Sequence, residues 1–437
     1  MVCSTHSETP RPLSLTVLHG RQGNNNKPNI PFLFFGNPLS IPTADEYFDR
    51  IYRIMSVLDE ENIKIISAMK KFGPRNLQHI SRKSKVPYPT VYTRVNKLET
   101  EKLLATWVYP NYSKIGMARA ILLITPAHGR ELLAREALKI PNYWIRVIRC
   151  SGEVNGFYSV HAVPAEHRQD FEHFAEQLVT SGLVSEYKIL WLGEFTSNIP
   201  NFEYFDTKKK NWKFSWQTWL KMFVDQAPAP KFDEPESQKT SFDRNDLIIL
   251  KELNLDARTK LSDFAKLLGI TLPAAKYRFD TLVRKGLVHD WIVNVLPYPP
   301  ETSDLMEVRL DFRDEGLLVA NEKVLARLPF VLDWSRVRAK NSITTRVFLQ
   351  RNEVNNLLTL LSALVRRSVL ERFSLLTLDP MTIECQTFSY EYFADGSGWH
   401  YDNREYISSL RKLVSAFQKQ ELQPPTFKEA GLLEVLI

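Results

Sequence analysis

A long internal repeat constrains the fold of this chain more than any other feature. Shifting Leu58–Val108 forward by 184 residues places it on Phe242–Ile292 without a gap, and eight of the 51 aligned positions are identical. Fifteen positions are apolar in both copies. Because shared apolar spacing is what a common core requires, the two stretches are predicted to fold alike.

Each copy predicts three short helices followed by a strand hairpin. Asp59 and Asp243 stand where a helix N-cap is wanted, and apolar residues recur after them at helical spacing. Shorter helices are predicted at 76–84 and 260–268, and Thr271 can cap the third helix of the second copy. Three helices and a small strand pair are typical of a winged helix-turn-helix, whose third helix enters the DNA major groove.

Basic residues are concentrated in the first copy. Between Asn62 and Leu98 there are nine Lys or Arg and no acidic residue, within a chain of net charge +7. Such a block suits phosphate neutralisation, and polar side chains of the third helix can contact bases. The residues predicted to bind double-stranded DNA are Arg82, Lys83, Lys85, Tyr88, Thr90, Thr93, Arg94 and Lys97, with Lys276, Tyr277 and Arg278 in the less basic second copy.

Other interpretations of these heads remain open. Winged helices also serve as protein-interaction modules, and a basic face is often merely solvated. Arg94 and Arg278 can instead form a structural ion pair with an acidic residue on the first helix.

The segment after each copy alternates strands and helices. Residues 117–192 predict the order βαββαβ, and residues 305–378 repeat it. This order is that of a ferredoxin-like domain, in which helices cover one face of the sheet and the other face is free to pair with a second sheet. The predicted fold class is therefore α+β, with two winged helix-turn-helix domains alternating with two ferredoxin-like domains.

The predicted domain organisation follows from these patterns. A helix is predicted at 43–56 and another at 402–419, and aromatic tails after each unit are expected to cover the sheets. The segments are a disordered extension (1–44), winged helix-turn-helix domains (45–110 and 241–297), ferredoxin-like domains (111–198 and 298–380), an aromatic tail and linker (199–240), and a C-terminal aromatic and helical tail (381–437).

Several stretches resemble the Lrp/AsnC family of bacterial and archaeal transcription factors. They include Leu58-Asp-Glu-Glu-Asn-Ile-Lys-Ile-Ile, Pro89-Thr-Val-Tyr-Thr-Arg-Val-Asn-Lys-Leu-Glu99, Ser151-Gly-Glu-Val-Asn-Gly-Phe-Tyr158 and Lys276-Tyr-Arg-Phe-Asp-Thr-Leu-Val-Arg-Lys-Gly-Leu-Val288. The resemblance spans about two-thirds of the chain. It implies a tandem duplication of the winged helix-turn-helix plus a ferredoxin-like (RAM-type) domain, and it implies DNA binding by the third helix.

The resemblance also implies a small-molecule effector, usually an amino acid, near the turn between the second and third strands. In the first copy that turn has Gly152, Asn155 and Gly156, which are the predicted effector residues. The second copy has Lys340-Asn-Ser342 there and no glycine. Because such regulators usually form homodimers with separated heads, two units in one chain imply an internal pseudo-dimer, or a further even assembly, with unequal heads.

Two functions other than a regulator remain as alternatives. Siroheme decarboxylases resemble the same unit and need a histidine and basic residues near the second hairpin. Here Arg146, Arg149 and Asn155 are available, but the nearest histidine is His161 at the far end of the third strand. An architectural or protein-interaction module without an effector is the other alternative.

Catalytic and membrane signals are weak. Glu166, Asp170 and His173 share a helical face with His167 beside them, a pattern that suits a hard-metal site or a solvated surface. We therefore expect no metal, no cofactor and no catalytic residues, and we expect that the protein is not an enzyme. Three scattered cysteines and the absence of a membrane-length apolar run favour a reducing, cytoplasmic compartment.

Overall fold

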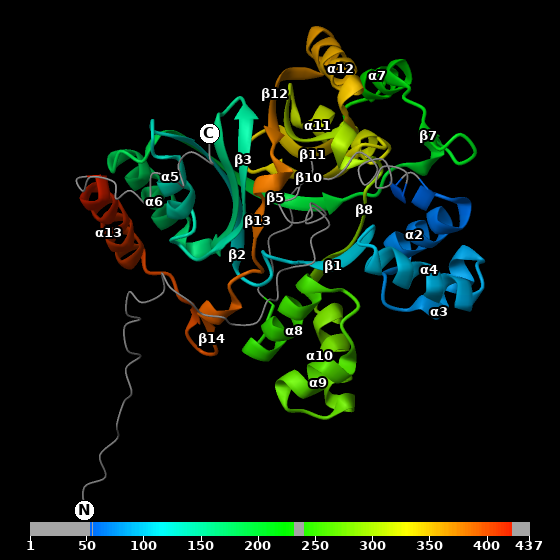
Figure 1. The fold of residues 1–437 in the computed structure, drawn as a ribbon, viewed down its shortest axis with the longest axis horizontal. Coiled ribbons are helices and arrows are strands. Elements are labelled where there is room, and N and C mark those ends of the chain that lie inside the picture. The colour runs from blue at the N-terminus through cyan, green and yellow to red at the C-terminus, as the bar shows by residue number, and fades with distance from the viewer. Residues whose placement is uncertain (1–52, 55, 231–239, 422–437) are drawn as a thin grey trace, which may run out of the picture.

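Two three-helix heads are built from the repeated stretches (Figure 1). The computed structural model describes residues 53–54, 56–230 and 240–421, so the predicted extension at 1–44 and most of the helix predicted at 43–56 lie outside the described residues. The first head consists of α2 (Glu60–Phe72), α3 (Leu77–Ser84) and α4 (Tyr88–Thr100), and the second of α8 (Arg244–Leu255), α9 (Leu261–Leu268) and α10 (Leu272–Arg284). The predicted helices of both heads are confirmed.

The caps predicted from the sequence fix where these helices begin. The Asp59 carboxylate accepts a hydrogen bond from the backbone N–H of Asn62 at 2.7 Å, and Asp243 forms a reciprocal capping box with Asp246. Each cap satisfies N–H groups that have no partner within the helix. Thr271 caps α10 in a similar way, whereas Pro87 precedes α4 without a side-chain cap.

The strand that leaves each head does not form the predicted local hairpin. Strand β1 (Leu104–Pro110) follows the first head and pairs antiparallel with β8 (Val288–Val295), which follows the second, with Val108 opposite Trp291. Each head supplies a single strand, whose backbone groups need a ladder partner, and the equivalent strand of the other head provides it. The two heads therefore share one two-stranded ribbon.

The remaining long strands close into one eight-stranded antiparallel barrel. The first half supplies β2 (Met117–Pro126), β3 (Trp144–Gly152), β4 (Gly156–Pro164) and β5 (Val184–Ser197), and the second half supplies β9 (Ser303–Phe312), β10 (Val331–Val337), β11 (Ser342–Gln350) and β12 (Leu370–Leu378). The order is β12-β9-β11-β10-β5-β2-β4-β3, and β3 pairs back with β12. The sequence led us to expect two sheets that meet through their free faces, but here they also join edge to edge.

The helices between the strands lie outside the barrel. They are α5 (Glu131–Ala137), α6 (Arg168–Thr180), α11 (Glu315–Leu325) and α12 (Val354–Arg366), and 3₁₀ turns occur at Ala165–His167, Phe202–Tyr204, Pro300–Thr302, Arg351–Glu353, Pro380–Thr382 and Tyr390–Tyr392. Along β2, Ala120 and Leu122 belong to the apolar core that includes the buried residues of α6, whereas Ile121 and Leu123 belong to the other core. This alternation gives each strand an interior and an exterior face.

The two aromatic tails cross to opposite halves of the molecule. Helix α7 (Trp216–Val224) contacts α11 and α12, while the C-terminal helix α13 (Asn403–Glu421), which was predicted at 402–419, contacts α5 and α6 (Figure 1). Short strand pairs precede them, β6 (Phe205–Asp206) with β7 (Asn211–Trp212) and β14 (Phe393–Ala394) with β15 (Gly398–Trp399), and β13 (Glu384–Cys385) pairs with β3. Instead of covering the sheet of its own half, each tail packs on helices of the other.

Buried indole groups anchor both crossings. The Nε1 of Trp212 donates a hydrogen bond to the carbonyl oxygen of Pro297 at 2.9 Å, and the Nε1 of Trp399 donates to that of Ile115 at 2.6 Å. Each aromatic residue thereby satisfies its polar atom while it buries its ring. Within the described residues, no helix is both long and apolar enough to cross a membrane.

Candidate nucleic-acid interface

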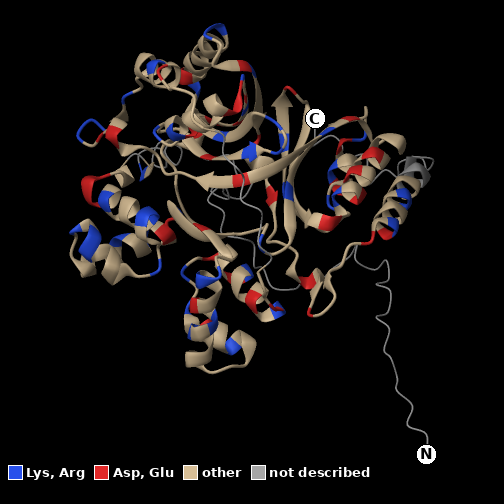
Figure 2. Ribbon diagram, turned by 180° about the vertical axis from the view of Figure 1, so that it is seen from behind, with Lys and Arg blue, Asp and Glu red and all other residues tan. Residues whose placement is uncertain are grey.

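The turn between α3 and α4 forms the most basic exposed surface of the first head. Lys85 ends α3 in the left-handed conformation, with φ of 58°, and Arg82 and Lys83 lie in the last turn of that helix. All three side chains are exposed, and none has an ion-pair partner among the described residues. Figure 2 shows Lys and Arg positions on both heads, with the first head beside the barrel and the second head below it. We call Arg82, Lys83 and Lys85 the basic turn.

The outer face of α4 continues this surface. Tyr88 is 42% exposed, and Thr93 and Lys97 are also exposed, whereas Thr90 is half-buried. Lys97 lies 3.9 Å from the carboxylate of Glu101, which is a loose surface pair. Tyr92, which was not among the predicted residues, is 51% exposed, and its ring centroid lies 6.2 Å from that of Tyr88. The four-residue spacing of these two tyrosines was the available signal.

Arg94 occupies a structural ion pair, the alternative that the sequence left open. Its Nη1 lies 2.6 Å from Oδ2 of Asp59 and 3.2 Å from Oδ1 of Asn62, and its Nη2 pairs with Glu61. Burial works against the charged form, but the hydrogen bonds to Asp59 and Glu61 and the charges of these two carboxylates together outweigh it and raise the pKa of Arg94. The ion pair named as an alternative is thus present, and the prediction that Arg94 contacts DNA stays a prediction.

Arg278 is held in the same way in the second head. Its Nη1 lies 2.9 Å from Oδ2 of Asp243 and 3.2 Å from Oδ1 of Asp246. The rest of α10 exposes little net charge, since Lys276 pairs with Asp280 at 3.0 Å and Tyr277 is 68% exposed. The second recognition helix therefore offers an aromatic ring and few unpaired cations. The sequence had likewise predicted a less basic second copy.

Two more basic residues of the first head face the other half of the molecule. The ammonium group of Lys70 lies 2.9 Å from the carboxylate of Asp290 on β8. Arg75 donates to the carbonyl oxygens of Ala257 and Thr259, and it lies over the ring of Phe279 at 4.6 Å. The heads are therefore in direct contact, whereas the family resemblance implied separated heads.

The turn predicted to bind an effector lies at the seam where the two halves of the barrel meet. The backbone N–H of Glu153 donates to the carbonyl oxygen of Leu375, and the Asn155 side chain accepts from the backbone N–H of Gly152 at 3.3 Å. A Cβ on Gly152 would lie 2.5 Å from the Leu375 oxygen, and one on Gly156 would lie 2.1 Å from a backbone oxygen of β2. Close backbone approach thus accounts for both glycines without a ligand.

The histidines and acids that suggested a metal face are engaged with one another. Nδ1 of His167 lies 2.7 Å from Asp170, and Nδ1 of His173 lies 3.5 Å from Glu176. The His167 ring also stacks on Tyr401 with centroids 5.0 Å apart. Within residues 53–54, 56–230 and 240–421, no group of three or more such side chains is placed to hold a metal ion.

Comparison with known proteins supports the interpretation of the heads. The family described as winged helix-turn-helix DNA-binding matches residues 242–289, which include all three helices of the second head. The HTH-type transcriptional regulator LrpA of Pyrococcus abyssi is 34% identical over 82 residues, or 19% of this chain, and LrpA of Pyrococcus horikoshii matches equally well. Over these 82 residues the chain is similar to regulators of the Lrp/AsnC type. It spans 58% of the length of these curated relatives.

Solved structures resemble this chain only distantly. The siroheme decarboxylase NirDL is 13% identical, with a TM-score of 0.46, and the match covers 82% of this chain and all of that one. LrpC of Bacillus subtilis is 18% identical, with a TM-score of 0.27, over 31% of this chain and 95% of that one.

Proposed function

We propose that the chain is a DNA-binding transcriptional regulator of the Lrp/AsnC type. The observation that carries this proposal is the match of a winged helix-turn-helix DNA-binding family to the second head, together with the exposed basic turn of the first head. In such heads the third helix enters the major groove. Arg82, Lys83 and Lys85 would contact phosphates, while Tyr88, Thr93 and Lys97 face the groove from α4.

The molecule is best explained as an internal pseudo-dimer of two duplicated units. Within each half the strands pair alike: β2 pairs with β4 and β5, and β9 pairs with β11 and β12. This pairing and the βαββαβ order support the proposal of a ferredoxin-like, RAM-type domain in each half. A tandem duplication that joined two subunits in one chain accounts for this pairing and for the shared ribbon. Light scattering of the full chain should therefore give a monomer or an even assembly of whole chains.

Contact between the heads has a consequence for the DNA site. Arg75 of the first head donates a hydrogen bond to the loop at Thr259 and lies over the ring of Phe279 on α10 in the second head. These contacts hold the two recognition helices, α4 and α10, at a fixed spacing. The two helices differ in charge and in exposed side chains. We therefore propose that the chain binds an asymmetric site and that the first head supplies most of the affinity.

DNA binding can be tested through its dependence on salt. Anisotropy titrations of genomic DNA fragments bound by the full chain should give a linear decrease of log affinity with log salt, and Arg82→Ala with Lys83→Ala should reduce the slope by about 0.9 for each phosphate that the protein no longer neutralises. Lys221→Ala with Lys323→Ala removes the same charge from positions on α7 and α11, away from the heads, and should leave the slope unchanged. Equal slopes for the two double variants would exclude the basic turn as the DNA contact.

Neither alternative function is favoured by the side chains. His161, the histidine that a decarboxylase would need, lies against Phe171 of α6, and burial lowers the pKa of His161 to about 3. A histidine with that pKa is neutral at physiological pH, and its burial keeps the ring away from a substrate in the hairpin. An architectural protein would bind all DNA alike, so uniform footprints across a genome would favour that role over a regulator.

A further inference from the structure

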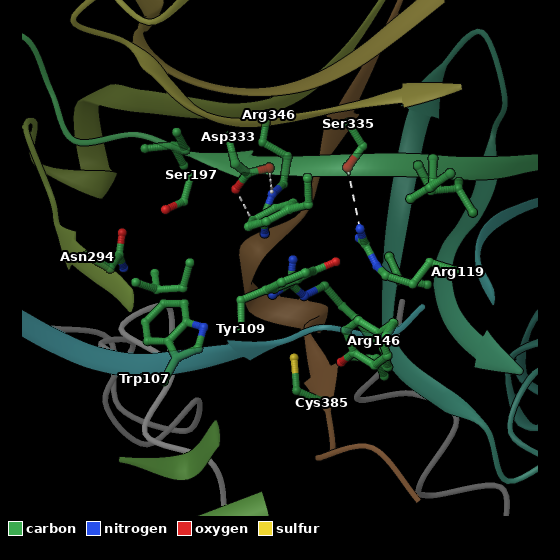
Figure 3. Close-up of a pocket in the computed structure, with 18 of the residues that line it drawn as sticks. Trp107, Tyr109, Arg119, Arg146, Ser197, Asn294, Asp333, Ser335, Arg346 and Cys385 are labelled. Carbon is green, nitrogen blue, oxygen red and sulfur yellow. Dashed lines mark hydrogen bonds and ion pairs between the residues drawn. The ribbon is translucent and has the colours of Figure 1, made fainter. Parts of the chain in front are cut away.

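One cavity in the structure has no role in the proposed DNA contacts. It has a volume of about 130 Å³ and lies at the end of the barrel that is covered by the β1–β8 ribbon (Figure 3). Both halves of the barrel line it, since Arg119 and Arg146 come from β2 and β3 and Asp333 and Arg346 come from β10 and β11. The ribbon contributes Tyr109. No histidine is among the described residues that line this cavity.

The charged groups of the cavity do not balance. Arg346 is paired with Asp333, with Nε and Oδ1 3.0 Å apart, and the hydroxyl of Thr344 donates to Glu307. Arg119 makes one long hydrogen bond, from Nη1 to the Ser335 hydroxyl at 3.4 Å, and it has no carboxylate partner among the described residues. Arg146 has neither an ion pair nor a side-chain hydrogen bond there.

Four hydrogen-bond donors of the cavity lack acceptors, and one of them is the Nδ2 of Asn294 on the ribbon. The Nε atoms of Arg119 and Arg146 and the hydroxyl of Tyr109 are buried without a hydrogen-bond partner in the described structure. Figure 3 shows these three side chains on the same side of the cavity. Both arginine side chains are partly buried, so leaving a buried Nε–H without an acceptor is unfavourable, and a carboxylate is the group that arginine binds in a bidentate manner. The missing partner therefore has the chemistry of a small anion.

The cavity walls define the rest of that ligand. The ring of Tyr109 stacks on Phe195 with centroids 3.9 Å apart, and Trp107 and Tyr158 also line the cavity. Aromatic walls with a few convergent polar groups are typical of small-molecule sites. The volume is below the roughly 300–1,000 Å³ of sites for drug-sized ligands, but an engineered apolar cavity of about 150 Å³ can bind benzene.

We propose that this cavity binds a small organic carboxylate, with the carboxylate on Arg119 and Arg146 and the apolar body against Tyr109 and Phe195. The site is distinct from the turn at Gly152–Gly156, and it does not depend on the proposed DNA-binding function. A macrocycle is too large for it, so the ligand class differs from that of a tetrapyrrole enzyme.

Position in the fold links this site to the heads. Tyr109 lies on β1, Val293 and Asn294 lie on β8, and Asn254 of α8 both lines the cavity and donates to the carbonyl oxygen of Val108 at 2.9 Å. A bound carboxylate would therefore contact the ribbon from which both heads emerge. The further claim that the bound carboxylate changes the affinity for DNA rests on the proposed function. Such coupling requires that the carboxylate bind the DNA-free and the DNA-bound protein with different affinities.

Calorimetry of the full chain with benzoate and benzamide tests the site. The two probes have nearly the same shape and differ in charge, so benzoate should bind and benzamide should bind at least tenfold more weakly. Arg119→Gln with Arg146→Gln should abolish this preference. Arg149→Gln, on the exposed face of the same strand as Arg146, should keep it. If the wild-type protein binds benzoate and benzamide equally, or binds neither, the proposal is overturned. This outcome needs no variant, so it holds even if the double variant does not fold.

Two further measurements separate the ligand class and the coupling. Phenylalanine and phenylpyruvate share a ring and a carboxylate, but only phenylalanine carries an ammonium group. If phenylalanine binds and phenylpyruvate does not, the cavity is an amino-acid site and the proposal of a plain carboxylate site is overturned. Adding benzoate should change the affinity for DNA at least threefold in the wild type and not in the double variant. Unchanged DNA affinity alongside benzoate binding would overturn the coupling, while absence of DNA binding altogether would contradict the regulator and leave the carboxylate site in place.

Discussion

The guanidinium of Arg75 in the first head donates a hydrogen bond to the main-chain carbonyl oxygen of Thr259 in the second head, with Nη2 and O 2.8 Å apart. The same group also donates to Ala257 and covers the ring of Phe279. Burial lowers the pKa of Arg75 to about 10, so it stays charged at neutral pH. One side chain thus connects the two three-helix heads through residues that are 182 or more positions away from it in the sequence.

Removing this connection should free the heads from one another. Arg75→Ala should lower the free energy of unfolding by about 2 kcal/mol, because it leaves two carbonyl oxygens without a charged donor. Urea unfolding measures the change, and Lys64→Ala, on the outer side of α2, is the control that removes the same charge. If both variants unfold at the same urea concentration, the heads are not held by this contact.

Arg94→Ala should act on stability more than on phosphate binding. Its ion pair is about one-third exposed, so we expect the free energy of unfolding to fall by about 1 kcal/mol. The salt slope of DNA binding should stay close to that of the wild type, in contrast to the basic-turn variant. Thr100→Ala, at the exposed end of α4 and outside the predicted DNA-binding residues, serves as the control for truncation on this helix. A slope reduced by a full phosphate contact would restore Arg94 to the DNA interface.

The seam glycines should resist substitution for steric reasons. In Gly156→Ala the new Cβ would lie 2.1 Å from the carbonyl oxygen of Ile124, so the backbone must shift, at a cost of about 3 kcal/mol. Gly129→Ala meets nothing within 4 Å and carries only the strain of its positive φ, about 1 kcal/mol. Thermal unfolding should therefore rank the two variants in that order. The reverse order would mean that Gly156 is not closely packed against β2.

Glu307 should make stability depend on pH. Burial raises the pKa of Glu307 from 4.5 to about 7, and the nearby charge of Asp333 adds to the rise. The hydrogen bonds from Thr344 and Tyr158 and the charge of Arg346 act in the opposite direction. Because the folded protein binds this proton more tightly than the unfolded chain, the contribution is complete below about pH 4.5 and is lost as the pH rises to about 7, for a total of about 3 kcal/mol.

Glu307→Gln isolates that effect. Between pH 4.5 and pH 7 the wild type should lose more stability than the glutamine variant, as measured by urea unfolding at both pH values. Glu131→Gln, which is exposed on α5, should follow the wild type. If the stability of Glu307→Gln falls as steeply with pH as that of the wild type, a group other than Glu307 causes the pH dependence.

Local elements were predictable from the sequence, but the contacts between distant elements were not. Asp59 and Thr271 predicted helix starts because caps act within four residues. In contrast, nothing near residue 104 shows that β1 pairs with β8, since a strand's ladder partner depends on the whole topology. Arg94 looked like a DNA ligand because spacing cannot show that Asp59, 35 residues earlier, lies beside it.

The candidate carboxylate site was beyond sequence reasoning for the same reason. Arg119 and Arg146 lie in strand segments whose alternation predicted a sheet, yet only closure of the barrel places both beside Tyr109 from the ribbon. In the sequence, Arg146 stands out only as part of a hairpin. A basic residue at an inward strand position was the available signal, since such positions are normally apolar.

The crossing of the tails also bears on how this protein is made. Trp399 covers Ile115, so the part of the molecule that leaves the ribosome early is completed by a segment that leaves it almost 300 residues later. Until then, apolar surface on the helices of the first half stays open to other chains. Nascent chains should thus depend on chaperones until late in translation, and a ribosome stalled before residue 399 should yield an aggregation-prone product instead of a folded half.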